Sequence, residues 1–418
     1  MQSRVPAVVS AKLAASKCKA KISNAMRILL GHTLPPRPDY GEAWVNAWLA
    51  RLRMAGFDVH PFSLVLNEKR GIAYWSELDS LWRTGDRNLC ELYNRLGERL
   101  RDFDVFICYN GANVHPGILE SFPTFNVYAC FDDPENTEHL SRPVAAAFDM
   151  ALVGNLAELD RYRNWGVKFV HHWPHGFRFD DFDPALTRAD ILSGSRDVDV
   201  TLLCERVAPW RRERVDRFAA RFPQGAYYGP GWPSGFLPEP ARVPLLQRTK
   251  IGINIHNSTG PINFRTFYLP ANGVMQICDN KSYLGGLFEL GKEIAGYDTI
   301  EEAIELTRYY LDHDNERREI AARGFERAHR DYNEVAAFRR IADAIASRRY
   351  SKTPPGTAVP EFLARHRRNT LVPRLATLAA APLTIPLRQL KRIAAAGRRR
   401  LARKYSNLTL RAALSRKK

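Results

Sequence analysis

Arg265 and Asn263 are the side chains whose types and spacing most directly suggest chemistry. They lie in the segment 250–279, in which a polar loop and then a helix, starting near Phe264, separate two apolar strands. A loop between a strand and a helix leaves backbone N–H groups unpaired and partly positive, which suits a phosphate. A guanidinium in the first helical turn can fork onto a diphosphate, and Asn263 can cap the helix. The alternative is a plain strand–helix–strand unit in which Arg265 is solvated.

Two carboxylates and one histidine follow other apolar segments that are typical of buried strands. Asp132 and Asp133 come after the apolar run 124–130, and His115 comes after an earlier run of the same kind. Because adjacent carboxylates repel each other, one of the pair is suited to take a proton from an acceptor hydroxyl. His115 could act as a base or contact a phosphate. The alternatives are a turn or helix cap before Pro134 for the acidic pair, and an ordinary loop histidine.

Three histidines within five residues, His171, His172 and His175, raise the question of a metal site. In an extended segment neighbouring side chains point to opposite faces, so His171 and His172 should not share one ion. No acidic or cysteine partner lies close to them in the sequence, as a zinc site would require. The sequence therefore predicts no metal, and His175 is expected to line the functional site.

An ordered series of residues between 263 and 324 matches one known family. The series consists of Asn263, Arg265, Phe267, Ala271, Gly273, Asp279, Leu287, Phe288, Gly291, Lys292, Glu293, Tyr297, Tyr309, Tyr310, Leu311, Arg317, Ile320, Ala321 and Gly324. It resembles the C-terminal half of the spore-maturation (CgeB-type) glycosyltransferases, which are similar to two-domain nucleotide-sugar glycosyltransferases with the GT-B fold. The clear resemblance covers residues 197–346, and a looser one covers residues 26–183.

The resemblance implies roles for several residues. A protein of this kind would bind a nucleotide-diphosphate sugar in its C-terminal half and the acceptor in its N-terminal half, with no metal and no other cofactor. Arg206 and Arg211 have the spacing of two cations that grip the donor diphosphate in related enzymes; a solvated basic helix start is the alternative. Asp132 and Asp133 match an acidic pair that faces the acceptor. Gly286 follows the donor loop and would let the backbone approach a ligand.

Position 268 departs from the family pattern. The family usually has a glutamate there, which in related enzymes holds the ribose hydroxyls of the donor, whereas this chain has Tyr268. A hydrogen bond to a charged group contributes about 1.5–3 kcal/mol and a neutral one about 0.5–1.5 kcal/mol, so the exchange could lower donor affinity about tenfold. Tyr268 is expected to face the donor ribose or base, where stacking could change the choice of donor.

Apolar strands alternate with helical segments throughout residues 26–350. This alternation predicts parallel sheets flanked by helices, with functional groups beyond the carboxyl ends of the strands. The expected fold class is α/β of the GT-B type, with two Rossmann-like domains facing each other across a cleft. In GT-B proteins terminal helices return across the first domain, and residues 334–348 are candidates for this. The predicted parts are a basic N-terminal extension, 1–25; a Rossmann-like acceptor domain, 26–183; a Rossmann-like donor domain, 184–350; and a basic tail, 351–418.

The net charge of +17 is concentrated at the two ends of the chain. Residues 351–418 contain 17 Lys and Arg and one acidic residue, and residues 1–25 contain five basic residues and no acid, which leaves residues 26–350 with a net charge of −4. From Leu387 the tail has the pattern of a basic amphipathic helix, which can lie on an anionic membrane surface with about 1 kcal/mol from each basic residue. A solvated tail and contact with a polyanion are the alternatives. The acidic body argues against an extended nucleic-acid face.

The six cysteines and the absence of long apolar runs bear on location. Cys108, Cys130, Cys204 and Cys278 lie in or beside apolar strand-like segments and are interpreted as small core residues, with no metal-binding or redox motif. No run of 18 apolar residues is present, and the first 25 residues lack the apolar core of a signal peptide. The expected location is the cytoplasm, with the tail able to contact the inner face of the membrane.

We therefore expect a glycosyltransferase that moves a sugar from a nucleotide-diphosphate sugar to a hydroxyl of a saccharide, lipid-linked or protein acceptor. Two alternatives belong to other classes. One is a catalytically degenerate GT-B-like binding or scaffold protein, for which Tyr268 is the main argument. The other is a nucleic-acid-associated protein that acts through its tail, and the acidic body argues against it.

Overall fold

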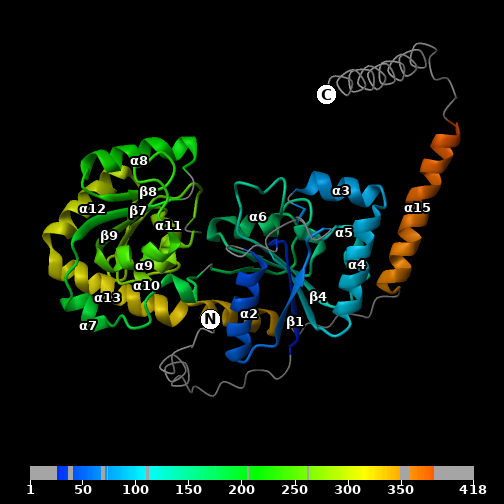
Figure 1. The fold of residues 1–418 in the computed structure, drawn as a ribbon, viewed down its shortest axis with the longest axis horizontal. Coiled ribbons are helices and arrows are strands. Elements are labelled where there is room, and N and C mark those ends of the chain that lie inside the picture. The colour runs from blue at the N-terminus through cyan, green and yellow to red at the C-terminus, as the bar shows by residue number, and fades with distance from the viewer. Residues whose placement is uncertain are drawn as a thin grey trace, which may run out of the picture. The chain divides into compact units, whose positions relative to one another are not determined.

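Two parallel β-sheets, each covered by helices on both faces, form the core of the protein (Figure 1). The computed structural model describes residues 26–35, 41–66, 71–72, 74–109, 113–174, 176–204, 207–260, 263–348 and 357–380. The N-terminal extension, Arg206, His175 and the predicted basic helix from Leu387 therefore lie outside the described residues. The chain divides into two compact units, residues 1–365 and residues 366–418.

The first sheet has six parallel strands in the order β2-β1-β3-β4-β5-β6. Its strands are β1 (Ile28–His32), β2 (Val59–Ser63), β3 (Val105–Tyr109), β4 (Phe125–Cys130), β5 (Met150–Val153) and β6 (Val170–His172). Alternate residues enter two different cores, as strand geometry requires: Leu29 faces one and Leu30 the other. Because both faces are covered, the strands are almost continuously apolar.

Helices on the two faces of the first sheet come from both ends of the chain. They are α2 (Glu42–Met54), α3 (Trp75–Arg83), α4 (Arg87–Leu100), α5 (Pro116–Leu119), α6 (Leu159–Asn164), α14 (Glu334–Ala346) and α15 (Val359–Ala380). Phe338 and Ile341 of α14 are fully buried in the core that contains Leu30, which confirms that the chain returns to the first sheet after the second. Val359 and Leu363, at the start of α15, are buried in the opposite core.

The second sheet has five parallel strands in the order β11-β10-β9-β7-β8. Its strands are β7 (Val198–Leu203), β8 (Ala226–Tyr228), β9 (Thr249–Asn254), β10 (Met275–Cys278) and β11 (Ala295–Gly296). Its helices are α7 (Arg188–Ser193), α8 (Pro209–Arg221), α9 (Glu239–Arg248), α10 (Arg265–Ala271), α11 (Lys281–Leu284), α12 (Ile300–Asp312) and α13 (Asp314–Asp331). Three short 3-10 helices, Ala145–Ala147, Leu156–Glu158 and Phe179–Asp181, complete the described elements.

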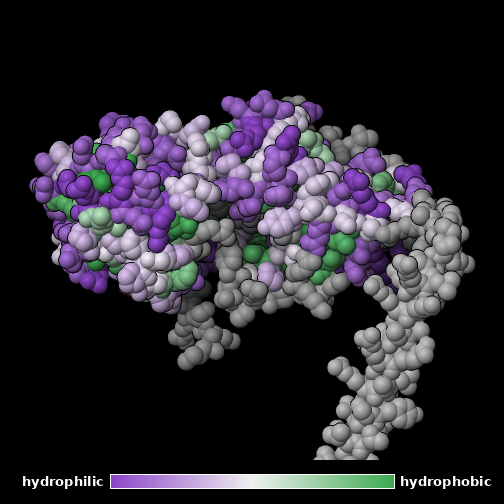
Figure 2. Space-filling model, turned by 90° about the horizontal axis from the view of Figure 1, so that it is seen from above, coloured by the Kyte–Doolittle hydropathy of each residue, from purple (hydrophilic) through white to green (hydrophobic). Residues whose placement is uncertain are grey.

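The polarity of the surface and the burial of the cysteines are those of a protein whose apolar residues pack in these cores. On the face drawn in Figure 2, hydrophilic residues predominate and hydrophobic residues occur in small separate groups. The cysteines in the described part of the chain are buried, as expected for small core residues. Within the same part, no helix combines the length and the apolar character needed to cross a membrane.

Candidate functional site

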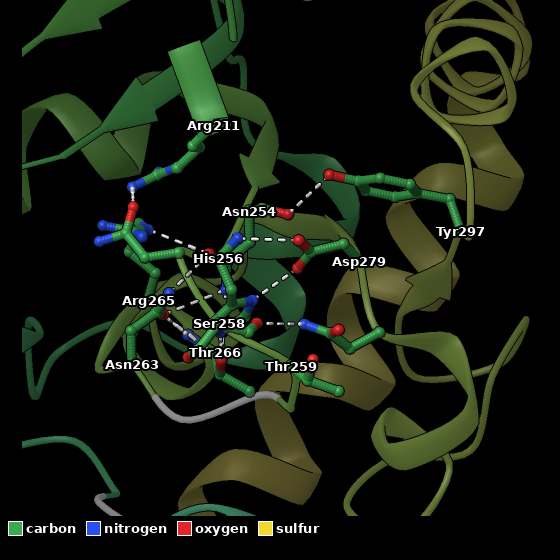
Figure 3. Close-up of polar contacts among 12 residues, drawn as sticks. Arg211, Asn254, His256, Ser258, Thr259, Asn263, Arg265, Thr266, Asp279 and Tyr297 are labelled. Atoms are coloured by element: carbon green, nitrogen blue, oxygen red, sulfur yellow. Dashed lines mark hydrogen bonds and ion pairs between the residues drawn. The ribbon is translucent and has the colours of Figure 1, made fainter. Parts of the chain in front are cut away.

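The loop between β9 and α10, residues 255–264, is anchored by the side chain of Asn254, the last residue of β9 (Figure 3). Asn254 is fully buried, and its Oδ1 accepts hydrogen bonds from Asn263 Nδ2 and Arg265 Nε, both at 3.0 Å. Its Nδ2 lies 3.2 Å from Asn263 Oδ1 and from the oxygens of Thr266 and Gln276. One buried amide therefore joins β9, β10 and the start of α10.

Asn263 and Arg265 occupy the positions that the sequence predicts, at the start of α10. Asn263 Oδ1 accepts a hydrogen bond from the backbone N–H of Thr266 at 3.2 Å and so satisfies one N–H of the first turn, although the residue at the N-cap position is Phe264. Arg265 Nη1 donates to the carbonyl oxygen of Leu203 at 2.8 Å, which fixes the guanidinium between the ends of β7 and β9. Since α10 has only seven residues, the cationic side chains rather than the helix dipole are the main attraction for an anion.

Arg211, in the first turn of α8, brings a second guanidinium to the same edge of the sheet. Its side chain is almost completely buried, and Nη1 donates to Asn257 Oδ1 in the loop at 3.1 Å. Burial, followed by the charge of Arg265, lowers the pKa of Arg211 to about 10. With this pKa Arg211 remains cationic at neutral pH, so the site brings together two guanidinium groups whose mutual repulsion a bound anion would relieve.

His256 and Asp279 form a buried pair that anchors the first residue of the polar loop. His256 Nδ1 and Asp279 Oδ1 are 2.5 Å apart, and the backbone N–H of His256 donates to Asp279 Oδ2 at 2.8 Å. His256 Nε2 also lies 3.3 Å from Thr266 Oγ1, at the start of α10 (Figure 3). The pair thus ties the ends of β9 and β10 to the helix that carries Arg265.

His256, Asp279 and Cys278 have ligand atoms within 4.8 Å of one another, which makes them a candidate metal group among the described residues. Burial raises the pKa of the Cys278 thiol well above its usual range, so a metal at this position would have to displace a proton from a buried sulfur. The Asp279 carboxylate already accepts two hydrogen bonds from His256. The chemistry of these side chains fits a structural anchor better than a metal site.

Of two residues expected at the donor site, Tyr268 is buried, and Gly286 lies beside Leu156, where its expected role stays a prediction. Tyr268 is only 7% exposed and packs in the core of the second sheet, with the guanidinium of Arg242 5.6 Å from its ring centre, so its ring is not open to a donor ribose or base. The helix turns position 268 inward, next to the buried Phe267. Gly286 approaches Leu156: a Cβ at this glycine would lie 3.4 Å from Leu156 Cδ1.

The three residues predicted to face the acceptor have different surroundings. Asp132 is exposed, whereas Asp133 is 1% exposed and its carboxylate accepts hydrogen bonds from Thr137 Oγ1 at 3.0 Å and from the Tyr162 hydroxyl at 2.5 Å. Both oxygens of Asp133 therefore have structural partners. Of the two carboxylates, Asp132 is the one that solvent or an acceptor can reach.

His115 is stacked between two indole rings of α3. Its ring centre lies 5.1 Å from that of Trp75 and 4.7 Å from that of Trp82, and the three planes are nearly parallel. Its Nδ1 accepts a hydrogen bond from the backbone N–H of Gly117 at 3.0 Å, and its Nε2 lies 3.5 Å from the carboxylate of Asp79. The histidine caps the short helix α5, and this environment supports packing more directly than proton transfer.

Asn155, which follows β5, is a site residue that sequence reasoning missed. It is 1% exposed, and its Nδ2 donates to the carbonyl oxygen of Thr259, in the polar loop of the second sheet, at 2.6 Å. The only local signal was a polar residue directly after a buried strand. Its partner is 104 residues further along the chain, and no sequence pattern connects the two.

Comparisons with known proteins agree with this architecture. A family model described as glycosyl transferase-like matches residues 204–343. HepE from Anabaena in complex with UDP and glucose is similar with a TM-score of 0.52 and 15% identity, over 77% of this chain and 100% of that chain. Sucrose-phosphate synthase from Thermosynechococcus elongatus gives 0.55 and 14%, over 78% and 100%. A glycosyltransferase from Rickettsia africae gives 0.53 and 11%, over 78% and 98%.

No curated protein matches the sequence. The solved structures are too distant in sequence to show more than the fold, and the family match covers one third of the chain. The two Rossmann-like sheets predicted from the sequence are present, and the chain has the GT-B fold, with a second sheet whose residues 204–343 are similar to the glycosyl transferase-like family.

Proposed function

We propose that the protein is a glycosyltransferase that moves a sugar from a nucleotide-diphosphate sugar to an acceptor hydroxyl. The observation that carries the proposal is the pair of cations Arg211 and Arg265 at the carboxyl edge of the second sheet, the edge at which α/β sheets bind ligands. The glycosyl transferase-like match covers the same residues, and a protein of the same fold has been solved with UDP and glucose.

The proposed chemistry is a transfer in which the anomeric carbon leaves the diphosphate oxygen for the acceptor oxygen. The bonding electrons go to the diphosphate, whose growing negative charge Arg211 and Arg265 stabilise, so no metal is needed in this scheme. The proton of the acceptor hydroxyl goes to a base, for which the exposed carboxylate of Asp132 is the candidate. Asp133 holds the segment in place through Thr137 and Tyr162.

The proposed location and acceptor are supported by charge rather than by the site. The strongly basic residues 351–418 suit the anionic inner face of a membrane, while the face of the body in Figure 2 is mainly hydrophilic. We therefore place the protein in the cytoplasm, in contact with the membrane through its tail, where a lipid-linked acceptor would be within reach.

Thermal unfolding of the full-length chain with UDP, GDP, ADP and their glucose conjugates tests the donor site. A ligand at one hundred times its dissociation constant adds about 2.7 kcal/mol to the free energy of unfolding, so one donor class should raise Tm. Arg265→Ala and Arg211→Met should abolish that rise. Arg317→Met is the matched control, because Arg317 is equally buried but pairs with Asp314 on α13: it should lower Tm and keep the ligand-induced rise.

Measuring the release of nucleoside diphosphate alongside thermal unfolding separates catalysis from binding alone. A second candidate function is a binding protein that retains the diphosphate site but does not turn over a donor. The burial of Tyr268 in the core favours this candidate, because the family position for holding the donor ribose is then not available. Donor-dependent stabilisation together with release of free nucleoside diphosphate from the sugar conjugate supports the transferase. Stabilisation without any release supports the binding protein, and no stabilisation by any donor overturns both.

A further inference from the structure

The turn that follows β5 reaches across to the polar loop of the second sheet. Asn155 Nδ2 donates to Thr259 O at 2.6 Å and to Asp133 O at 3.3 Å, while Asn155 Oδ1 accepts from the backbone N–H of Ala157 at 3.0 Å. The side chain is 1% exposed. A single buried amide thus connects the acidic segment after β4, the turn after β5 and the loop after β9.

Residues of the second sheet's loops accommodate this turn at two positions, Gly260 and Gly286. Gly260 has a φ of +98°, and a Cβ there would lie 1.8 Å from Asn155 Oδ1, so a side chain at position 260 would displace the amide. Leu156 packs against the core of the second sheet, and a Cβ at Gly286 would lie 3.4 Å from Leu156 Cδ1. Contacts by hydrogen bonding and by packing therefore come from two consecutive residues.

We infer that Asn155 is a positioning residue that holds the donor loop in its binding conformation and links it to the acidic segment of the first sheet. The inference rests on the proposed function only in calling this loop the donor loop. Thr259 lies two residues after Asn257, which contacts Arg211, and four before Asn263, which accepts from an N–H in the first turn of the helix of Arg265. The hydrogen bond to the carbonyl of Thr259 limits the motion of the loop between these two contacts. Arg211 and Arg265 are therefore held in their binding positions before a donor binds.

The side-chain amide of Asn155 also links the segment of the proposed base, Asp132, to the proposed donor loop. Asp132, the exposed carboxylate, precedes Asp133, and the carbonyl of Asp133 shares the Asn155 amide with Thr259. A change at Asn155 should therefore act on donor binding through the loop, although Asn155 itself belongs to the turn after a strand of the first sheet. A residue that served only the packing of the first sheet would have no such effect.

The test uses Asn155→Ser in the full-length chain. Serine keeps an oxygen able to cap the N–H of Ala157 but cannot reach Thr259. The control is Asn280→Ser, because Asn280 Nδ2 donates to the neighbouring carbonyl of Ser258 at 3.4 Å from within the second sheet. Hydrogen exchange of the amides of residues 256–260 is measured without ligand, together with Tm.

Asn155→Ser should speed exchange of these amides about tenfold, the effect of losing one ordinary buried hydrogen bond, and Asn280→Ser should change it less. With a donor, KM should rise about tenfold in Asn155→Ser while kcat changes much less. Leu156→Ala, which loses only the packing contact, should speed exchange in the same loop and provides the test if Asn155→Ser does not fold.

Two results would overturn the inference: unchanged exchange in Asn155→Ser, or an equal increase in both asparagine variants. Faster exchange in Asn155→Ser in a protein that binds no donor would leave the positioning role in place and reject the proposed function instead. The two failures are therefore distinguishable in one set of variants.

Discussion

At the scale of single residues, His32 shows how burial without a partner affects stability. It ends β1, it is fully buried, and among the described residues neither of its ring nitrogens has a hydrogen-bond partner. Burial lowers the pKa of His32 from its usual 6.5 to about 4. His32 therefore takes up a proton at a higher pH in the unfolded chain than in the folded protein. As a result, the free energy of unfolding must fall as the pH drops from 6.5 towards 4.

We expect His32→Leu to stabilise the protein and to reduce its sensitivity to acid. Removing a buried polar group without partners should add about 1 kcal/mol or more to the free energy of unfolding at pH 7. At pH 5 the wild type should lose roughly a further 2 kcal/mol through His32, at 1.36 kcal/mol per pH unit below 6.5, and the variant should not. Urea unfolding at both pH values measures the difference. A less stable variant at pH 7 would mean that the imidazole makes a favourable contact.

At the scale of elements, the sequence predicts strands and helices well where the apolar pattern is long and local. The apolar run 124–130, predicted to be a buried strand, coincides with β4 except for its first residue, and the expected helix start near Phe264 lies one residue from the start of α10. Short or proline-containing elements such as β8 and α9 were not predicted, because three residues or an internal Pro244 give little periodic signal.

The candidate site was predicted only in part for a different reason. Asn263 and Arg265 were found because a strand, a loop and a helix are consecutive in sequence. Asn254 and Asn155 were missed because their roles depend on partners on other strands. Tyr268 was placed wrongly with respect to exposure, since the direction of a side chain in a seven-residue helix depends on how the helix packs.

The start of α15 gives a test of how one element is attached to its sheet. Leu363 is 1% exposed in the core of the first sheet, and Gly97 of α4 makes room for Val359: a Cβ at Gly97 would lie 2.6 Å from the valine side chain. Leu363→Asp would bury a carboxylate in an apolar core, so we expect a loss of about 3 kcal/mol or more and rapid proteolysis near residue 357. Ala364→Asp, at an exposed position of the same helix, should change neither. Equal behaviour of the two variants would show that α15 does not need this contact.

At the scale of the whole molecule, charge is divided between a slightly acidic body and strongly basic ends. Residues 381–418 alone contain 12 Lys and Arg and no acidic residue. At about 1 kcal/mol for each basic residue near an anionic surface, even half of them would hold the protein on a membrane. We expect the full-length chain to sediment with vesicles containing 30% phosphatidylserine, and a chain ending at Ala380 to remain in solution.

The charge argument also predicts how this binding responds to its surroundings. Vesicles of phosphatidylcholine alone should bind neither protein, and 0.5 M salt should release the full-length chain, because screening shortens the range of each charge to a few ångströms. Duplex DNA added as a competitor decides between the two polyanions: if DNA displaces the vesicles at equal phosphate concentration, the tail is a general anion binder and the membrane assignment fails. If the vesicles remain bound, the membrane proposal stands. The tail would then bring the protein to a surface on which lipid-linked acceptors are concentrated. In that case donor turnover should be higher when such an acceptor is supplied in anionic vesicles than when it is supplied in neutral vesicles.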